Sequence, residues 1–138
     1  MVYEVTVEAS FVARHGIRLP DGTVEPSHEH DWRVTARFVG SQLDACGLLV
    51  DFDAVKAALV QVLAPLRGAD LNRTPALHGL NPTAENVAHV ILEGLFERCG
   101  RDPRLFSVTV TEAPGCAAVC QRSPFSPTRQ FDDEVDGF

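Results

Sequence analysis

The sequence predicts a single α+β domain, in which a four-stranded antiparallel sheet is covered on one face by two helices. Two observations carry this prediction: strand-like segments stand in pairs towards the two ends of the chain, and two segments with helical spacing stand together between them. The order strand, strand, helix, helix, strand, strand favours this arrangement over a repeating parallel βαβ unit. A length of 138 residues, of which 45% are hydrophobic, is sufficient for one core.

The first pair of strands is expected at residues 3–15 and 30–39. Both segments alternate between apolar and polar residues, which is typical of a strand with one covered face. The apolar positions are Val5, Val7, Ala9, Phe11 and Ala13 in the first segment, and Trp32, Val34, Ala36 and Phe38 in the second. Residues 16–27, with two glycines and two prolines, are expected to form the connecting loop.

The two helices are expected at about residues 53–65 and between Thr83 and Gly100. Helical spacing of apolar residues predicts the inner faces, which consist of Val55, Leu59, Val62, Leu63 and Leu66 in the first helix and Val87, Val90, Ile91 and Leu95 in the second. Thr83 follows a proline and is the expected N-cap of the second helix, and Gly100 is its expected stop signal.

The second pair of strands is expected at residues 105–112 and 116–122, which completes a domain of residues 1–122. The remaining segment, residues 123–138, contains prolines and serines followed by a run of acidic residues. Its acidic residues are Asp132, Asp133, Glu134 and Asp136. We expect this segment to be a loosely held tail.

The composition excludes several classes of protein. The formal net charge is −7 and Lys56 is the only lysine, which argues against a surface that binds nucleic acid. No apolar run is long enough to span a membrane. The first ten residues alternate like a strand and lack the basic flank and apolar run of a secretion signal, so we expect a cytoplasmic protein with reduced cysteines.

Three histidines share the covered face at the ends of the first two predicted strands. His15 is in phase with the apolar positions of residues 3–15, and His28 and His30 are in phase with those of residues 30–39. A His-x-His pair alone is more often exposed or hydrogen-bonded than metal-bound, but a third imidazole on the matching face strengthens the metal interpretation. Three neutral imidazoles with an open position are the usual donor set of a catalytic Zn²⁺, although iron, cobalt or nickel also accept it.

The other histidines and the cysteines are not expected to bind a metal. His78 falls in a loop and His89 near a helix surface, so a structural role is favoured for both. The motif "CAAVC", with Cys116 and Cys120, has a three-residue gap and no second cysteine pair. We expect these two cysteines to be buried thiols in the last strand.

Glu112 stands at the end of the third predicted strand, in phase with the inward-facing Val108 and Val110. A carboxylate on a covered face is costly unless it is paired or hydrogen-bonded. The strand can end before Glu112, which would leave the side chain in solvent. Alternatively, its two oxygens accept a pair of N–H donors from a ligand such as the 2-amino group and ring N–H of a pterin or a guanine.

Five segments, in the same order, resemble the 6-pyruvoyl-tetrahydropterin synthase and 6-carboxy-tetrahydropterin synthase family of the tunnelling fold. "FVARH" resembles its first metal-ligand strand, and "HEHDW" its His-Gly-His motif with a following aromatic residue, Glu29 replacing the glycine. "GLLVDFDAVK" and "NPTAENVA" resemble the segments at the starts of its two helices, and "VTVTEA" the strand that ends in its pterin-anchoring glutamate. The resemblance covers about residues 3–121.

The resemblance implies a zinc ion held by His15, His28 and His30, and a pterin ring held by Glu112. It also implies trimers, each closing its sheets into a barrel, that stack into hexamers with pockets shared between subunits. In the family, zinc binds the side-chain hydroxyls of 7,8-dihydroneopterin triphosphate and acidifies them. A cysteine then moves protons, helped by an Asp–His pair, and triphosphate is eliminated.

The sequence departs from the family at the groups that move protons. Val24 stands at the position of the family cysteine, and Arg67 and Gly68 stand at the positions of the Asp–His pair. Glu25 is one residue from the cysteine position, and some family members use a glutamate in this region to cleave the substrate to 6-hydroxymethyl-dihydropterin. Glu25 is therefore a candidate base, and the alternative is a solvated loop residue.

The expected function is a zinc-dependent, lyase-type reaction on the side chain of a dihydropterin by a modified mechanism. Arg14 and Arg18 flank the first histidine and, with Arg67, permit an anionic substrate. Two alternatives stay open. One is a non-catalytic protein that binds a pterin or purine through Glu112, and the other is a protein whose zinc only ties two strands together.

Overall fold

The computed structural model of the protein describes residues 1–123. Most of the predicted acidic tail, residues 124–138, therefore lies outside the described residues. The described elements are β1 (Tyr3–His15), β2 (His28–Gly40), α1 (Phe52–Leu63), a short 3₁₀ helix η1 (Pro75–Leu77), α2 (Ala84–Arg98), β3 (Leu105–Ala113) and β4 (Cys116–Gln121).

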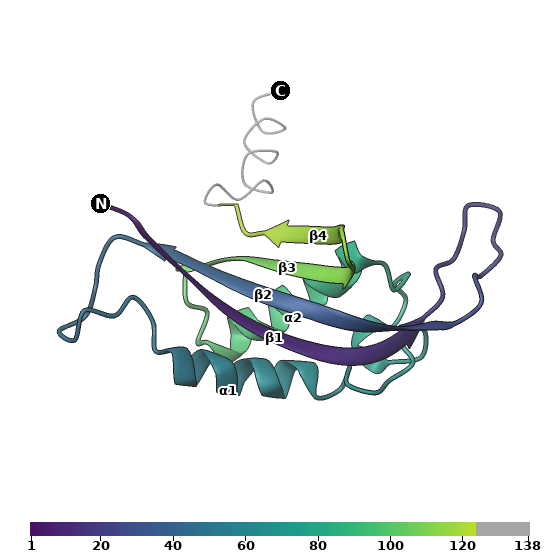
Figure 1. The fold of residues 1–138 in the computed structure, drawn as a ribbon, viewed down its shortest axis with the longest axis horizontal. Coiled ribbons are helices and arrows are strands. Elements are labelled where there is room, and N and C mark those ends of the chain that lie inside the picture. The colour runs from purple at the N-terminus through teal and green to yellow at the C-terminus, as the bar shows by residue number, and fades with distance from the viewer. Residues whose placement is uncertain (124–138) are drawn as a thin grey trace, which may run out of the picture.

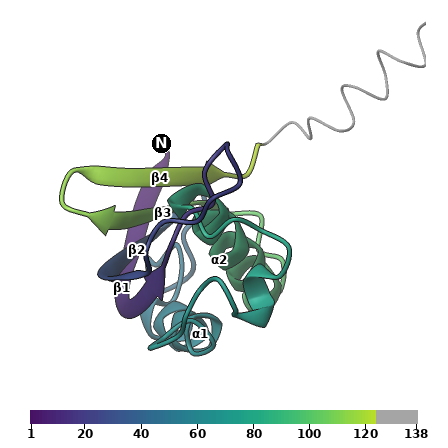
Figure 2. The same ribbon diagram turned by 90° about the vertical axis from the view of Figure 1, so that its right-hand side faces the viewer.

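The strands form one antiparallel sheet in the order β1-β2-β3-β4. Figure 1 shows α1 beneath the strands and α2 behind them, and Figure 2, turned by 90°, shows both helices on the same face of the sheet. The molecule therefore has two layers, and the predicted α+β fold with two helices on one face of a four-stranded sheet is confirmed. The outer edges of the sheet are β1 and β4.

The hairpin of β1 and β2 is the longest part of the sheet. The two strands pair without interruption from Tyr3 opposite Gly40 to His15 opposite His28. The second strand was expected to begin at residue 30, but it begins two residues earlier because the ladder continues to the last residue of β1. This continuous pairing brings the first two histidines of the predicted site directly opposite each other.

Both helices begin with side-chain caps. Asp51 accepts hydrogen bonds from the backbone N–H groups of Asp53 and Ala54 at the start of α1. Thr83, the predicted cap, accepts one from the Asn86 N–H (3.1 Å) at the start of α2. Within residues 1–123, no helix is both long and apolar enough to cross a membrane.

The core lies between the covered face of the sheet and the two helices. Its largest fully buried side chains include Phe11, Trp32, Phe38, Leu59, Leu63, Leu66, Leu71, Ile91, Leu95 and Leu105. Most of the inner positions predicted by strand and helix spacing are buried, and Val62 and Val90 pack partly buried against the core. Phe11 and Trp32 stack with ring centroids 5.9 Å apart, which continues the apolar layer up to the histidines.

The cysteines of β4 are less buried than predicted. Cys116 is exposed and Cys120 is only half-buried. Since β4 is an edge strand with one strand neighbour, its side chains have less cover than those of β2 or β3. The prediction of two buried thiols was therefore wrong for Cys116.

A β-bulge interrupts the pairing of β3 with β4 at the residue of greatest interest. Thr111 pairs with Ala117 and Ala113 with Cys116, so that Glu112 has no partner in this ladder. A bulge bends its strand and re-aims the extra side chain. Glu112 is half-buried and belongs to β3, which excludes the alternative that the strand ends before it.

Candidate metal centre

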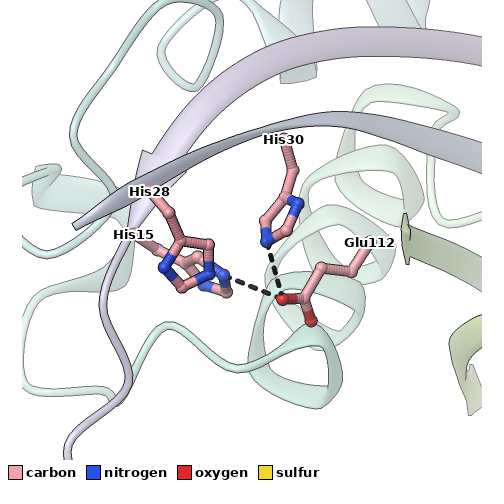
Figure 3. Close-up of side chains that lie close together, drawn as sticks. All are labelled: His15, His28, His30 and Glu112. Carbon is pink, nitrogen blue, oxygen red and sulfur yellow. Dashed lines mark hydrogen bonds and ion pairs between the residues drawn. The ribbon is translucent and has the colours of Figure 1, made fainter. Parts of the chain in front are cut away.

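Three imidazoles and one carboxylate meet at one end of the sheet (Figure 3). His15 is the last residue of β1, His28 and His30 lie at the start of β2, and Glu112 reaches towards them from β3. One donor atom from each residue lies within 4.8 Å of the donor atoms of the other three. The structure thus brings together the three predicted metal ligands and the predicted ring anchor.

The four side chains differ in their access to solvent. The His15 side chain is completely buried, whereas those of His30 and Glu112 are 22% and 20% exposed. The cluster is therefore closed on the side of the core and open towards the surface. This asymmetry suits a centre that keeps one side accessible to a ligand.

Backbone carbonyls determine which nitrogen of two imidazoles carries a proton. His15 Nδ1 lies 2.7 Å from the carbonyl oxygen of Pro82, and His28 Nδ1 lies 3.0 Å from that of Pro26. Because a carbonyl oxygen only accepts hydrogen bonds, Nδ1 must be the donor in both rings. In the neutral ring, Nε2 then holds a free lone pair, as in metal-binding histidines whose other nitrogen donates to a carbonyl.

The contact between His15 and Glu112 brings two acceptors together. His15 Nε2 lies 2.9 Å from Glu112 Oε1, and His30 Nε2 lies 3.1 Å from the same oxygen. The His30 nitrogen is buried and, despite this short distance, has no hydrogen bond of acceptable geometry. Neutral imidazoles and an ionised carboxylate therefore leave room for one more cation at this contact, either a proton shared by the two groups or a metal ion.

The donor set fits a zinc ion. Zinc prefers four tetrahedral ligands, with bonds of roughly 2.0–2.1 Å to imidazole nitrogen and a similar distance to carboxylate oxygen. Neutral imidazoles with the Nδ1–H group engaged elsewhere present the lone pairs that such an ion accepts. The buried Nε2 of His30, which makes no hydrogen bond to the described residues, is the observation that favours a metal over a set of ordinary histidines.

Two asparagines hold the chain that follows His15. The Asn72 side chain accepts from the Gly16 N–H (2.8 Å) and donates to the Gly16 carbonyl (2.7 Å). Asn81 makes the same pair of bonds with Arg18, at 2.8 Å and 3.0 Å. Each amide thus replaces the strand neighbour that the chain has lost at the end of β1.

The segment before Asn72 continues the sheet at the outer edge of β1. Gly68 N–H donates to the Val12 carbonyl (2.6 Å), and Arg14 N–H donates to the Ala69 carbonyl (2.9 Å). Gly68 therefore has a backbone role here, and Arg67 is exposed. Neither residue supplies the groups of an Asp–His pair.

Glu25 has a defined place beside the same segment. Its Oε1 accepts from the Ile17 N–H (2.9 Å), and its backbone N–H donates to the Ile17 carbonyl (3.0 Å). A Cβ on Gly16 would lie 2.3 Å from the Glu25 carbonyl oxygen, so this close approach requires glycine. Val24, at the position expected for the cysteine, is exposed.

The cysteine with an imidazole neighbour lies elsewhere in the described structure. Cys120 Sγ is 3.8 Å from His89 Nδ1, and His89 Nε2 is 3.0 Å from Glu93 Oε1. Burial, with a smaller contribution from the Glu93 charge, raises the pKa of the Cys120 thiol. The neutral thiol is therefore favoured, and this cluster does not replace the missing cysteine with a ready thiolate.

An open hollow of about 440 Å³ adjoins the imidazoles and the Glu112 carboxylate. It is lined by Glu29, His30, Asp31, Arg33, Thr111, Glu112, Ala113 and Pro114. A second hollow, of about 210 Å³, lies behind the His15 segment and includes Arg18, Arg73 and His78. The two hollows give the region one surface with mainly acidic side chains and another with cationic ones.

Sequence patterns did not reveal the asparagines or the proline carbonyl. Asn72 and Asn81 are 56 and 63 residues from the backbone that they hold, and Pro82 is 67 residues from His15. The segments "ADLN" and "LNP" indicate only an asparagine in a loop, which does not predict the backbone groups that the asparagine binds. Contacts over such separations depend on the packed fold.

Comparison with protein families identifies one model that covers nearly all of the described chain. The model of 6-pyruvoyl tetrahydropterin synthase matches residues 4–123. No curated protein sequence shows a significant match.

Solved structures with the same fold include enzymes from a nematode and from two Plasmodium species. The 6-pyruvoyl tetrahydropterin synthase of Caenorhabditis elegans superposes with a TM-score of 0.80 at 20% identity, over 89% of this chain and 97% of that one. The Plasmodium vivax enzyme gives 0.73 at 20% identity, over 89% and 99%. The Plasmodium falciparum enzyme gives 0.70 at 18% identity, over 88% and 98%.

Proposed function

Since the chain belongs to the 6-pyruvoyl tetrahydropterin synthase family, we propose that it is a zinc-dependent enzyme of the lyase type acting on a dihydropterin. The substrate is 7,8-dihydroneopterin triphosphate or a related compound, and the reaction changes its side chain. The observation that carries the proposal is the convergence of three histidine nitrogens beside an open hollow, one of them buried and without a hydrogen bond to the described residues. Residues 1–122 form the catalytic domain, and the enzyme acts in the cytoplasm.

The three imidazoles of His15, His28 and His30 hold the metal. A zinc ion in this place would polarise a side-chain hydroxyl and make it more acidic. The protein contributes the orientation of the rings, because the Pro82 and Pro26 carbonyls keep the Nδ1 protons of His15 and His28 away from the metal.

Glu112 is the group that recognises the ring. It lines the 440 Å³ hollow, and its two oxygens match a 2-amino group and an adjacent ring N–H. Hydrogen bonds from two N–H donors to a charged carboxylate are short and strong. Loss of the Glu112 charge should therefore weaken ring binding markedly. The hollow also contains Thr111 and Asp31, which offer further polar contacts.

Glu25 is the proposed base in place of the family cysteine. One carboxylate oxygen is held by the Ile17 N–H, while Oε2 makes no hydrogen bond to the residues that the structure describes. The anchored oxygen fixes the group, and the free oxygen is available to accept a proton from a substrate hydroxyl. In two Plasmodium vivax structures of this family a catalytic glutamate is replaced, by alanine in one and by cysteine in the other.

The active protein is an oligomer built on trimers, and we expect two trimers to form a hexamer. Among residues 1–123, β4 has one strand neighbour, and residues 68–71 cover the outer edge of β1 only near His15, so both strands keep an open edge; Val119 on β4 is an exposed apolar residue. Edge-to-edge pairing of three sheets would close a barrel and remove these edges from solvent. The pocket of each subunit would then be completed by its neighbour.

A non-catalytic pterin- or purine-binding protein is the second candidate. The observation in its favour is the loss of the usual proton-transfer groups, because Val24 is exposed and Gly68 has only a backbone role. Such a protein would keep the metal and Glu112 but leave its ligand unchanged.

The test is incubation of the zinc-loaded protein with 7,8-dihydroneopterin triphosphate, followed by mass spectrometry of the small molecules. A new pterin supports the enzyme, and its mass distinguishes side-chain elimination, cleavage to 6-hydroxymethyl-dihydropterin and formation of 6-carboxy-tetrahydropterin. Unchanged substrate, with bound zinc verified, would contradict the proposed reaction on this substrate.

Two variants separate the enzyme from the binding protein. Glu25→Gln should abolish turnover while pterin binding stays within about twofold, since Glu25 moves a proton and does not hold the ring. Glu112→Gln should instead weaken pterin binding. Turnover that survives Glu25→Gln would contradict the assignment of the base.

A further inference from the structure

The Glu112 carboxylate faces the imidazoles, although it also lines the hollow that would take the ring. Figure 3 shows one oxygen of Glu112 directed at both His15 and His30. That oxygen, Oε1, lies 2.9 Å and 3.1 Å from their Nε2 atoms. A carboxylate that only binds a ring in the hollow does not need contacts with these two imidazole nitrogens.

The distances are close to those between ligands of one metal ion. In a tetrahedral zinc site with bonds of roughly 2.0–2.1 Å, neighbouring ligand atoms are separated by about 3.3–3.4 Å. The two Glu112 contacts are only a few tenths of an ångström shorter. Small movements of the side chains would therefore give a centre with three nitrogen ligands and one oxygen ligand.

The bulge leaves Glu112 free to take a second position. Glu112 has no partner in the β3–β4 ladder, and its side chain is 20% exposed at the edge of the hollow. The carboxylate therefore has the imidazoles on one side and open space on the other. One carboxylate cannot direct the same oxygens to a metal ion and to the two N–H groups of a ring.

We infer that Glu112 is a metal ligand in the ligand-free protein and that it leaves the metal when a ring with two adjacent N–H donors enters the hollow. This inference rests on the proposed function and adds regulation of the metal site by ring binding. Binding of the ring would open the fourth coordination position at the moment when a substrate hydroxyl arrives. Without a ring, the carboxylate would keep that position closed to water and to other ligands.

The exchange couples the metal to the ring in both directions. A ring that draws Glu112 away from the metal must weaken metal binding, and by linkage the metal must weaken binding of the ring by the same factor. The coupling is visible only with a ring that has no side-chain hydroxyl of its own. Unsubstituted pterin is such a probe.

The experiment uses the full chain loaded with Co²⁺, whose visible absorption reports the number and type of its ligands. Wild type and Glu112→Gln are compared without a ring and with saturating pterin. Glu8→Gln is the control, because it removes one carboxylate charge from an exposed position of β1 that lies outside both the four-residue cluster and the hollow.

We expect Glu112→Gln to change the cobalt spectrum of the ligand-free protein and to lower metal affinity about 10- to 100-fold, as loss of a group that supports a metal does. Pterin should shift the wild-type spectrum and leave that of Glu112→Gln unchanged. Glu8→Gln should resemble the wild type throughout.

The outcomes separate this inference from the proposed function. Identical ligand-free spectra of wild type and Glu112→Gln would overturn the inference, as would pterin binding, followed by its fluorescence, that leaves the wild-type spectrum unaltered. In both cases a wild-type protein that still binds pterin leaves the proposed function standing. Absence of pterin binding to the wild type would contradict both.

Discussion

The two ends of the sheet differ in whether their charged and titratable side chains have complete hydrogen-bond partners. At the end formed by His15, His28 and Glu112, a carboxylate oxygen faces an imidazole nitrogen that also has a lone pair. The buried His30 Nε2 lies near the same oxygen but makes no hydrogen bond to the residues that the structure describes. At the other end, Asp102 accepts from the backbone N–H of Arg104 (2.9 Å) and from its guanidinium nitrogens Nε (2.9 Å) and Nη2 (2.7 Å).

This difference separates groups whose hydrogen bonds are complete within the protein from groups to which the proposed function assigns a metal ion and a ring. The Arg104 guanidinium also donates to the Leu49 carbonyl. The charged groups at the far end therefore have their hydrogen-bond partners within the protein and need no ligand. Its hydrogen bonds lower the pKa of the Asp102 carboxyl. The histidine end is short of one positive charge, and that deficit is a signature of a functional site rather than of a core.

The largest effect is expected from His15→Ala at the histidine end. The change removes the fully buried member of the proposed metal site, which no solvent-exposed group can replace. We expect metal affinity to fall by more than about 100-fold, the upper end of the effect seen for groups that only support a ligand. Competition with a chromophoric chelator measures this. A metal affinity of His15→Ala within threefold of the wild type would contradict the assignment of a metal site to the histidine end.

The next largest effect is expected from Asn72→Ala and Asn81→Ala. Each asparagine holds the backbone beside His15 through two hydrogen bonds, so its loss should loosen that ligand. We expect metal affinity to fall about 10-fold, as for groups that orient a ligand. Asn72→Asp keeps the acceptor for Gly16 N–H and should be intermediate.

The control for the asparagine variants is Asp102→Ala, which weakens the fold at the far end. If metal affinity merely followed stability, Asp102→Ala would lower it as well. Equal losses in Asn72→Ala and Asp102→Ala, at equal melting temperature, would contradict a positioning role.

Asp102→Ala itself should lower the free energy of unfolding by about 1–2 kcal/mol at pH 7, because it removes a half-buried charged acceptor of three hydrogen bonds. The Asp102 pKa is lower in the folded protein than its usual value of 3.8, so the ionised form stabilises the fold above that pH. The difference from wild type should shrink as the pH falls through the lowered pKa. Urea unfolding at pH 7 and below pH 4 tests this, and a constant difference would contradict it.

The smallest effect is expected from Glu4→Gln, which breaks the ion pair with Arg37. The two side chains are 52% and 35% exposed, and salt screens such pairs. We expect a change in melting temperature that is close to the error of measurement at physiological salt. A large drop in melting temperature that persists at 1 M salt would mean that the Glu4–Arg37 pair stabilises the far end as strongly as Asp102 does.

Strand alternation predicted much of this structure because it reports burial directly. The limits of β1 agree with the predicted residues 3–15, since its side chains alternate along the entire strand. The helix predicted at about 53–65 runs from Phe52 to Leu63, because Asp51 caps it and Pro65 lacks the N–H that would continue it. The same alternation placed the three histidines on the covered face.

The remaining features depend on contacts between distant segments. Strand phase indicated that Glu112 faces inward, but it did not indicate the bulge between Thr111 and Ala113 or the contacts of Glu112 with His15 and His30. The asparagine contacts and the Pro82 carbonyl arise only when the loops before α2 fold back on β1. Periodicity within one segment contains no information about such contacts.

The most direct test of a cation-deficient histidine end is an anomalous difference map at the zinc absorption edge, from crystals of zinc-loaded protein. We predict one peak per chain, about 2.0–2.1 Å from the Nε2 atoms of His15, His28 and His30. Absence of a peak there, with these nitrogens hydrogen-bonded to protein groups or water instead, would contradict the metal centre and the comparison built on it.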